Sequence, residues 1–311
     1  MGSRAAGIAL GVAIDAVVGD PRAGHPVALF GRTASALERR TYGDARARGA
    51  AHVTLLVGAA TGLGVLAERA RHPLARTALT AAATWAVIGG TTLAREGAHL
   101  ARALEDEDLA RARARLPHLC GRDPSQLEEP ELARATVESL AENTSDAVVA
   151  PLFWGAVAGV PGLLGYRAVN TLDAMIGHRS ARYERFGWAA ARLDDAANWV
   201  PARLTGLITA AVGPDSGRAL AVLRRDGHRH PSPNAGRCES AFAGALGLTL
   251  GGTNVYGGRV EHRPTMGDGR APEVADIRRA VRLTRAVGLT AAALSVLGAG
   301  AVSLLRAGRT R

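Results

Sequence analysis

Three carboxylates recur at helical spacing near the middle of the chain. Glu138, Glu142 and Asp146 lie at positions i, i+4 and i+8 of the string ESLAENTSD, so a continuous helix would place all three on one face. Like charges on one face repel one another unless a cation or an arginine accompanies them. Carboxylates with few protein ligands suit magnesium bound to a phosphate-bearing substrate. Because the string leads directly into an apolar stretch at Ala147, a functional role is favoured over an exposed acidic helix end.

Two further polar strings follow at helical spacing. NTLD contains Asn170 and Asp173, and DDAAN contains Asp194, Asp195 and Asn198. Both strings are embedded between apolar stretches, and a carboxylate at the centre of a bilayer costs about 2.5 to 3.5 kcal/mol. Such groups are therefore interfacial, paired or functional. The structural alternative is an ion pair that fixes helices, with one of the nearby arginines Arg167, Arg179, Arg192 or Arg203.

Polar turns occur near both ends of the chain. GDP at 19–21 is followed by His25, and the string HPSPNAG at 230–236 contains Ser232 and Asn234. Each is typical of an ordinary loop when taken alone. The glycine-rich run at 243–258 predicts a flexible element whose backbone N–H groups could face an anion.

Long blocks without charge indicate the elements that must position these side chains. Residues 49–67, 77–94, 147–166 and 286–305 contain no Asp, Glu or Arg, and such blocks approach the ~20 residues that cross a bilayer. The pattern predicts an all-α integral membrane protein, a multi-pass helical bundle. Gly58 and Gly62 lie four residues apart and predict close helix packing.

The whole chain is expected to form one membrane domain. Its successive parts are an apolar segment at 5–19, a transmembrane hairpin at 49–94, amphipathic cytoplasmic helices at 95–146, a site-forming region at 147–269 and a transmembrane anchor at 286–305.

The block at 147–166 differs from the others because proline and glycine interrupt it. Pro151, Gly155, Gly159 and Pro161 weaken a straight helix, so we expect this segment to be broken or re-entrant, as backbone that lines a binding site can be. A re-entrant segment would leave few arginines on one side of the membrane and nearly all on the other. The positive-inside rule then places the polar motifs on the cytoplasmic face of the cell membrane.

The composition excludes several classes of enzyme. All 38 basic residues are arginine, which excludes lysine Schiff-base chemistry and Walker-type phosphate loops. Cys120 and Cys238 have neither metal-ligand nor disulfide spacing. The net charge of +10 comes without interleaved basic and aromatic residues, so no nucleic-acid partner is expected.

Five longer strings carry a family resemblance. They are, in order, GDPRAGHPV, ESLAENTSDAVVAPLFW, YRAVNTLDAMIGH, RLDDAANWVPARLT and SPNAGRCESAFAGALGLTLGG. With them the chain resembles the CobD/CbiB family of cobalamin-biosynthesis membrane proteins, the adenosylcobinamide-phosphate synthases, over residues 15–269. Ala147 and Ala174 depart from the glycine and serine that the family often has there, and both keep a small side chain.

The resemblance implies a carbon–nitrogen ligase. The expected reaction joins adenosylcobyric acid, or cobyric acid, to aminopropanol or its O-phosphate through an amide, with ATP consumed and Mg²⁺ required. Corrinoid and amino-alcohol substrates and the lipid bilayer are therefore the expected partners. The runner-up is a magnesium-dependent prenyltransferase-like membrane enzyme, although only four each of Phe, Trp and Tyr are present to stabilise an allylic cation. A small-molecule transporter is the third possibility, and no internal repeat supports it.

On this resemblance the polar residues are expected to converge in one pocket at the lipid boundary. The expected catalytic carboxylates, sharing metal binding and amine deprotonation, are Glu138, Glu142, Asp146, Asp173, Asp194 and Asp195. Among them the expected metal ligands are Glu142, Asp146, Asp194 and Asp195. The expected substrate-binding residues are His25, Asn143, Arg167, Asn170, Arg192, Asn198, Arg203, Ser232 and Asn234.

Overall fold

The computed structural model describes residues 2–21, 24–256 and 259–308. It is an all-α membrane protein to which a single two-stranded hairpin is added in the described part of the chain. The chain comprises two compact units, and the single membrane domain expected from the sequence stays a prediction. Unit 1 comprises residues 1–89, 150–198 and 291–311, and unit 2 comprises residues 90–149 and 199–290.

The described residues of unit 1 form helices and the segments that connect them. Its elements are α1 (Ser3–Val18), α2 (Pro26–Thr41), α3 (Arg46–Glu68), α4 (Pro73–Val87), α8 (Ala150–Leu172), the π turn η3 (Asp173–Gly177), α9 (Trp188–Ala197) and the C-terminal part of α13 (Val274–Gly308).

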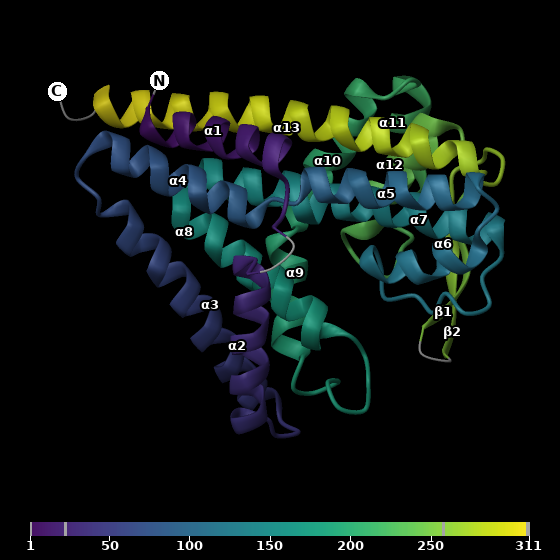
Figure 1. Ribbon diagram of the computed structural model, residues 1–311, viewed down its shortest axis with the longest axis horizontal. Helices are drawn as coiled ribbons and strands as arrows, with labels where there is room; N and C mark the ends of the chain where they lie inside the picture. Colours follow the sequence, from purple (N-terminus) through teal and green to yellow (C-terminus); the bar gives the residue numbers. More distant parts are fainter. Residues whose placement is uncertain (1, 22–23, 257–258, 309–311) are drawn as a thin grey trace. The chain divides into compact units, whose positions relative to one another are not determined.

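Helix α1 packs along α4 through small residues (Figure 1). Gly7 lies against Thr80, and one helical turn later Gly11 lies against Thr84. A Cβ atom at either glycine would meet the threonine side chain within 3 Å. The absence of a side chain therefore lets the two helix backbones approach closely.

Helices α3 and α4 lie in the region of the expected transmembrane hairpin at 49–94 and diverge from the turn that joins them. From the turn between them, α4 runs along α1 while α3 packs mainly against α8 (Figure 1). The prediction that Gly58 and Gly62 support close packing is wrong, because a Cβ atom at either position would meet open space. Gly64 makes the close approach instead, against the backbone of Pro161. The contact face of α3 is set by its partner α8, which the spacing of glycines alone does not reveal.

The Gly/Pro-rich segment is broken, as expected. Within α8, Gly159 has φ 68° and ψ −147°, a conformation that favours glycine. The chain turns back there, since Gly162 lies against the carbonyl oxygen of Trp154, eight residues earlier. In a straight helix those positions would be about 12 Å apart along the axis. The two halves of α8 therefore form a short helical hairpin.

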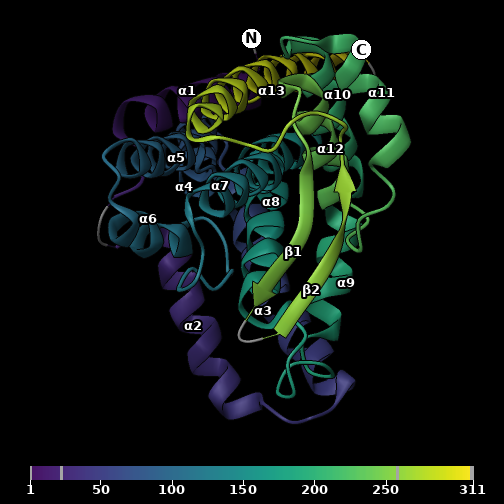
Figure 2. The same ribbon diagram turned by 90° about the vertical axis from the view of Figure 1, so that its right-hand side faces the viewer.

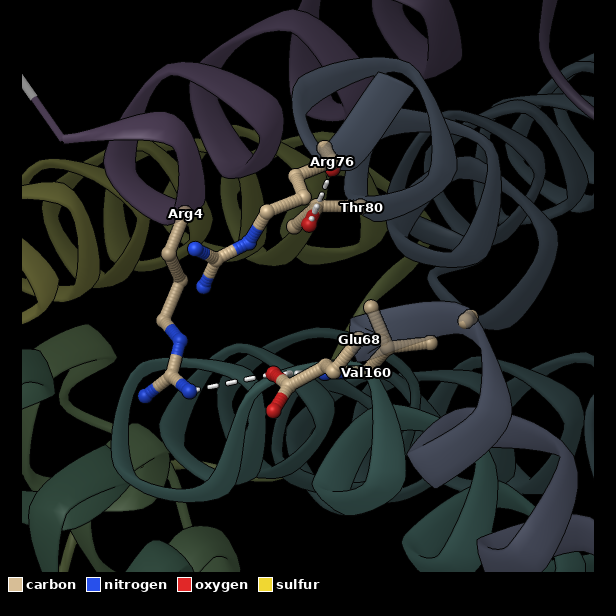
Figure 3. A pocket seen from close by; sticks show the side chains of 6 residues that line it. Arg4, Glu68, Arg76, Thr80 and Val160 are labelled. Carbon is tan, nitrogen blue, oxygen red and sulfur yellow. Dashed lines mark hydrogen bonds and ion pairs between the residues drawn. The ribbon is translucent and has the colours of Figure 1, made fainter. Parts of the chain in front are cut away.

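An ion pair holds the tip of this hairpin. Arg4 Nη2 lies 3.0 Å from Glu68 Oε1, and the same oxygen accepts a hydrogen bond from the backbone N–H of Val160 at 3.3 Å. Figure 3 shows Arg4 and Glu68 joined beside Val160, with Arg76 and Thr80 on the other side of a small hollow. The ends of α1 and α3 thus fix the point at which α8 reverses.

Unit 2 contains the remaining helices and both strands. Its elements are α5 (Gly90–Glu105), α6 (Leu109–Arg115), the 3-10 turn η1 (Leu116–His118), α7 (Glu129–Thr144), the π turn η2 (Ser145–Val149), α10 (Trp199–Val212), α11 (Ser216–Asp226), α12 (Ala235–Leu246), β1 (Leu250–Tyr256), β2 (Arg259–Met266) and the N-terminal part of α13.

The hairpin of β1 and β2 replaces the expected flexible glycine-rich element (Figure 2). Its strands are antiparallel, with a bulge between Leu250 and Gly252. Gly251 has φ 90°, and a Cβ atom there would collide with the carbonyl oxygen of Pro264. Glycine thus permits the bulge, and part of the run read as flexible is ordered strand. Gly257 and Gly258 lie outside the described residues.

Four helical segments of the described chain are long and apolar enough to cross a membrane. They are Arg46–Glu68, Pro73–Glu105, Glu129–Gly177 and Val274–Ala301. Each segment overlaps one of the four charge-free blocks of the sequence, and together they are compatible with a multi-pass membrane protein.

Candidate functional site

A buried ion pair anchors the ESLAENTSD string within unit 2. The Glu138 carboxylate, 4% exposed, accepts a hydrogen bond from Arg122 Nη2 at 2.6 Å. Its other oxygen accepts from the backbone N–H of Gly251 at 2.7 Å. Glu138 thus ties α7 to the loop that precedes this helix and to the strand bulge. Because both oxygens receive donors, the carboxylate is held in one orientation.

Glu142, one turn further along α7, is solvent-exposed. Among the described residues its carboxylate has no hydrogen-bond or ion-pair partner, although Arg263 and Arg122 are near enough to act on it electrostatically. It is therefore more exposed than Glu138, which is buried.

The π turn η2 follows, so the strict i, i+4, i+8 face is not continued to Asp146. A π turn inserts extra backbone into a helix and often marks a functional position. Asp146 is half-buried and lies near Cys238. The structure thus groups Asp146 with Glu138 and Glu142 in unit 2, by a different backbone geometry from the one expected.

A third glutamate completes the group. Glu239 in α12 is 1% exposed, and Glu138 and Glu142 both act on it electrostatically. Burial and these two neighbours raise the pKa of Glu239 well above its ordinary value, and Arg263 and Arg122 partly oppose the shift. Both effects favour the protonated form of the Glu239 carboxyl group.

His230 faces Glu239 across a gap. Its Nε2 atom lies 3.9 Å from Glu239 Oε1, while burial and the charge of Arg263 lower the pKa of His230 to about 4. The two residues are near enough for an ion pair, but both shifts favour the uncharged forms. We call Glu138, Glu142, Glu239, His230, Arg122 and Arg263 the carboxylate cluster.

The HPSPNAG turn positions this histidine. His230 Nδ1 accepts a hydrogen bond from the backbone N–H of Ser232 at 3.0 Å, so in the neutral ring the proton is on Nε2. Ser232 Oγ in turn accepts from the backbone N–H groups of Asn234 and Ala235 at 3.2 Å each. The expected binding residues Ser232 and Asn234 thus build the start of α12 and aim His230 at the cluster.

The same local geometry occurs at two other His-Pro dipeptides. His25 Nδ1 accepts from the N–H of Val27 at 3.2 Å, and His72 Nδ1 accepts from the N–H of Leu74 at 3.3 Å. Both histidines cap the start of a helix. His25 Nε2 lies 3.6 Å from Asp20 Oδ1 in the GDP string, whereas His72 is exposed. The sequence predicted a role for His25 but did not indicate this shared cap.

A second group of predicted residues lies in unit 1. Asp194 accepts hydrogen bonds from the side-chain amides of Asn198 at 3.0 Å and Asn170 at 3.4 Å. Asn198, 2% exposed, accepts in turn from the hydroxyl of Tyr166 at 2.8 Å. The NTLD and DDAAN strings are thus joined by hydrogen bonds between α8 and α9.

Arg167 extends this network to an apolar cavity. Its guanidinium donates to the carbonyl oxygen of Val87 at 2.8 Å and to Asn170 Oδ1 at 3.3 Å. The cavity beside it has a volume of about 390 Å³ and is lined mainly by apolar side chains of α2, α3, α4 and α8, including Pro26 and Val27. The strings HPV and YRAVN therefore meet at one cavity of unit 1.

The other predicted residues are placed as follows. Asp173 begins the second π turn, η3. Burial raises the pKa of Asp195, and Arg192 partly opposes the shift. Asn143 donates to the carbonyl oxygens of Leu119 and Ser139, a role in packing. Arg203 stacks on the Trp199 ring at 4.0 Å and donates to the Trp199 carbonyl oxygen.

The predicted carboxylates thus form two groups, each in its own unit: Glu138, Glu142 and Asp146 in unit 2, and Asp173, Asp194 and Asp195 in unit 1. Within the described residues, no three or more His, Cys, Asp or Glu side chains are arranged to hold a metal ion. The assignment of metal ligands and the convergence of all six carboxylates stay predictions. Sequence reasoning missed four members of the cluster, namely Glu239, His230, Arg122 and Arg263.

Comparison with known proteins gives a consistent result. The CobD/CbiB protein family matches residues 8–284. The chain is 56% identical over 299 residues to the cobalamin biosynthesis protein CobD of Mycobacterium tuberculosis (strain CDC 1551 / Oshkosh), covering 95% of this chain and 96% of that protein. It is 44% identical over 291 residues to the protein of the same name from Rhodobacter capsulatus, covering 90% and 93%. No solved structure gives a significant match. The chain belongs to the CobD/CbiB family.

Proposed function

We propose that this protein acts in cobalamin biosynthesis as an ATP-dependent carbon–nitrogen ligase. It would join the carboxylate of adenosylcobyric acid or cobyric acid to aminopropanol or its O-phosphate. The family match and the names of the relatives support the pathway. The observation that supports this reaction is the carboxylate cluster of unit 2, in which acidic side chains lie beside guanidinium groups. Its glutamates belong to two of the five motif strings.

The reaction requires an activated acid. A carboxylate is a poor acyl donor because its leaving group would be oxide, so the γ-phosphoryl group of ATP, or an equivalent group, must first be transferred to it. The amine nitrogen then forms a bond to the acyl carbon, the carbon–oxygen bond to phosphate breaks, and the amine loses a proton. The protein must neutralise charge on the phosphoryl group and accept that proton.

The described residues support a division of these tasks. Arg122 and Gly251 keep Glu138 oriented, which fixes the position of its carboxyl group beside Glu142 and Glu239. Glu142 is reachable from solvent, so it is proposed to receive the amine proton. The side chains do not form a ready metal site in the described chain, so magnesium is proposed to arrive bound to the phosphates of ATP, where it would offset their negative charge.

Location follows from the same proposal. ATP is supplied on the cytoplasmic side, and the arginine distribution predicts that the polar motifs face it. The membrane-spanning segments would then anchor the enzyme.

One experiment tests the function directly. Purified full-length protein in detergent would be incubated with cobyric acid, MgATP and aminopropanol or its O-phosphate, and the amide product measured by mass spectrometry. Glu142→Ala and Asp195→Ala are expected to abolish product in folded protein, while Glu107→Ala, on an exposed turn, is expected to leave it unchanged. Absence of product from the unaltered protein under all these conditions would contradict the proposal.

A further inference from the structure

The carboxylate cluster contains a hydrogen-bond donor, His230 Nε2, and an acceptor, Glu239 Oε1, that are too far apart to bond to each other. His230 is 8% exposed, and its Nε2 atom has no hydrogen-bond partner among the described residues. The Ser232 amide occupies Nδ1, which leaves Nε2–H as the donor. The nearest acid oxygen, Glu239 Oε1, is 3.9 Å away, beyond a normal hydrogen bond. A buried donor without an acceptor is costly, so this geometry indicates a ligand that completes it.

The character of the cluster favours an organic cation over a bare metal ion. Arg122 and Arg263 both act electrostatically on Glu142 and Glu239, and positive groups in this position oppose a divalent ion. A histidine whose Nε2 carries a proton cannot coordinate a metal through that atom. No group of metal-binding geometry occurs in the described part of the chain. A primary ammonium group needs only hydrogen-bond acceptors, which the glutamates provide.

The three glutamates differ in exposure. Glu142 is exposed, whereas Glu138 and Glu239 are 4% and 1% exposed. Glu138 is already bound by Arg122 and Gly251, so it is not an available acceptor. Glu142 and Glu239 remain as an outer and an inner acceptor, with His230 beside the inner one.

We propose that Glu142 and Glu239 bind the primary ammonium group of the amino alcohol, and that His230 Nε2–H donates to its hydroxyl or phosphoester oxygen. The inference rests on the proposed function for the identity of the ligand, and it makes His230 and Glu239 substrate-binding residues. An amino alcohol carries a cation and an oxygen acceptor on adjacent carbons, which matches one acceptor pair beside one donor.

The test measures binding, independently of turnover. Isothermal titration calorimetry of the full-length protein in detergent would use three probes: 1-amino-2-propanol, its O-phosphate and propane-1,2-diol, in which a hydroxyl replaces the amine. Both amines are expected to bind and the diol is not. Glu239→Gln is expected to weaken amine binding about tenfold to a hundredfold, because a charge-assisted hydrogen bond contributes about 1.5–3 kcal/mol. Comparison of the two amines identifies whether the free or the phosphorylated form is preferred.

Matched variants separate binding from folding. His230→Gln should weaken binding, whereas His72→Gln, which alters the same type of helix cap in an exposed position, should not. If Glu239→Gln does not fold, Glu142→Gln at the exposed position replaces it. The inference is overturned if folded Glu239→Gln and Glu142→Gln bind the amines as the unaltered protein does, or if MgCl₂ alone binds with an affinity that Glu239→Gln abolishes.

The two proposals fail differently. If the unaltered protein forms amide product while Glu239→Gln keeps the same Kd and KM for the amine, the ammonium subsite is wrong and the ligase stands. If the amines bind as described but no product forms with MgATP and cobyric acid, the ligase is wrong and the subsite stands.

Discussion

The Nε2 atom of His230 lies 3.9 Å from Glu239 Oε1, with both side chains buried in unit 2. Burial lowers the pKa of the histidine to about 4 and raises that of the glutamate. Both shifts favour the uncharged forms of two groups that lie near enough to form an ion pair.

The first prediction concerns acid stability. The folded pKa of His230, about 4, is below the value near 6.5 in an unfolded chain, so unfolding binds a proton in this interval. Its contribution is fully present above about pH 6.5 and is lost as the pH falls towards 4, by up to about 3 kcal/mol. Thermal unfolding in detergent between pH 7 and 4 should show a shallower decline for His230→Gln than for the unaltered protein. Equal slopes would contradict the assignment, and His72→Gln serves as the control.

The second prediction concerns the buried ion pair. Arg122→Met leaves the 4% exposed Glu138 without its partner, which should destabilise the protein by about 3–5 kcal/mol. Arg113→Met removes the partner of Glu128 at an exposed pair and should cost less than about 1 kcal/mol. The double variant Arg122→Met with Glu138→Gln should recover part of the loss. Denaturant or thermal unfolding measures these differences. A similar loss of stability in the two single variants would contradict the prediction.

The third prediction concerns the reversal of α8. Gly159→Ala should destabilise by about 1–3 kcal/mol, because its φ is 68° and a Cβ atom would meet the side chains of Glu68 and Arg4. Gly58→Ala and Gly62→Ala, in open space on helix α3, should be neutral or stabilise by up to about 1 kcal/mol. Thermal unfolding of the three variants checks this order. Equal stability of Gly159→Ala and Gly62→Ala would show that the reversal does not require glycine.

The fourth prediction concerns the unit 1 network. Asn198→Leu should cost about 1–3 kcal/mol, because it removes the hydrogen bonds that Asn198 makes with the Tyr166 hydroxyl and with Asp194. Tyr166→Phe removes one partner of Asn198, and a double-mutant cycle between the two positions should show coupling. Additive effects on unfolding would mean that the hydrogen bond contributes nothing to stability.

Part of the fold followed from composition. Charge-free blocks predicted the membrane helices, and Pro161 with Gly159 predicted the break in α8. The β hairpin was not predicted, because glycines at a bulge and glycines in a flexible loop look alike until the partner strand is known. The predicted helix contacts at Gly58 and Gly62 were wrong for a similar reason, because the spacing of residues within one helix does not identify the helix that packs against it.

The site was predicted in part as well. Helical spacing correctly brought Glu138 and Glu142 together, but Arg122 and Glu239 are separated from them in sequence and join only through folding. The string NAGRCES placed Glu239 next to a recognisable motif, and this proximity was the available signal. Nothing in the spacing of HPSPNAG indicated that the His230 side chain would face Glu239, which lies in the helix that follows this turn.

The chain reverses its direction at Gly159, within α8. Ala150 and Leu172 are the first and last residues of α8, and because its halves run in opposite directions the polypeptide leaves this element at the end where it came in. One glycine thus determines the direction in which the chain continues from α8 into η3.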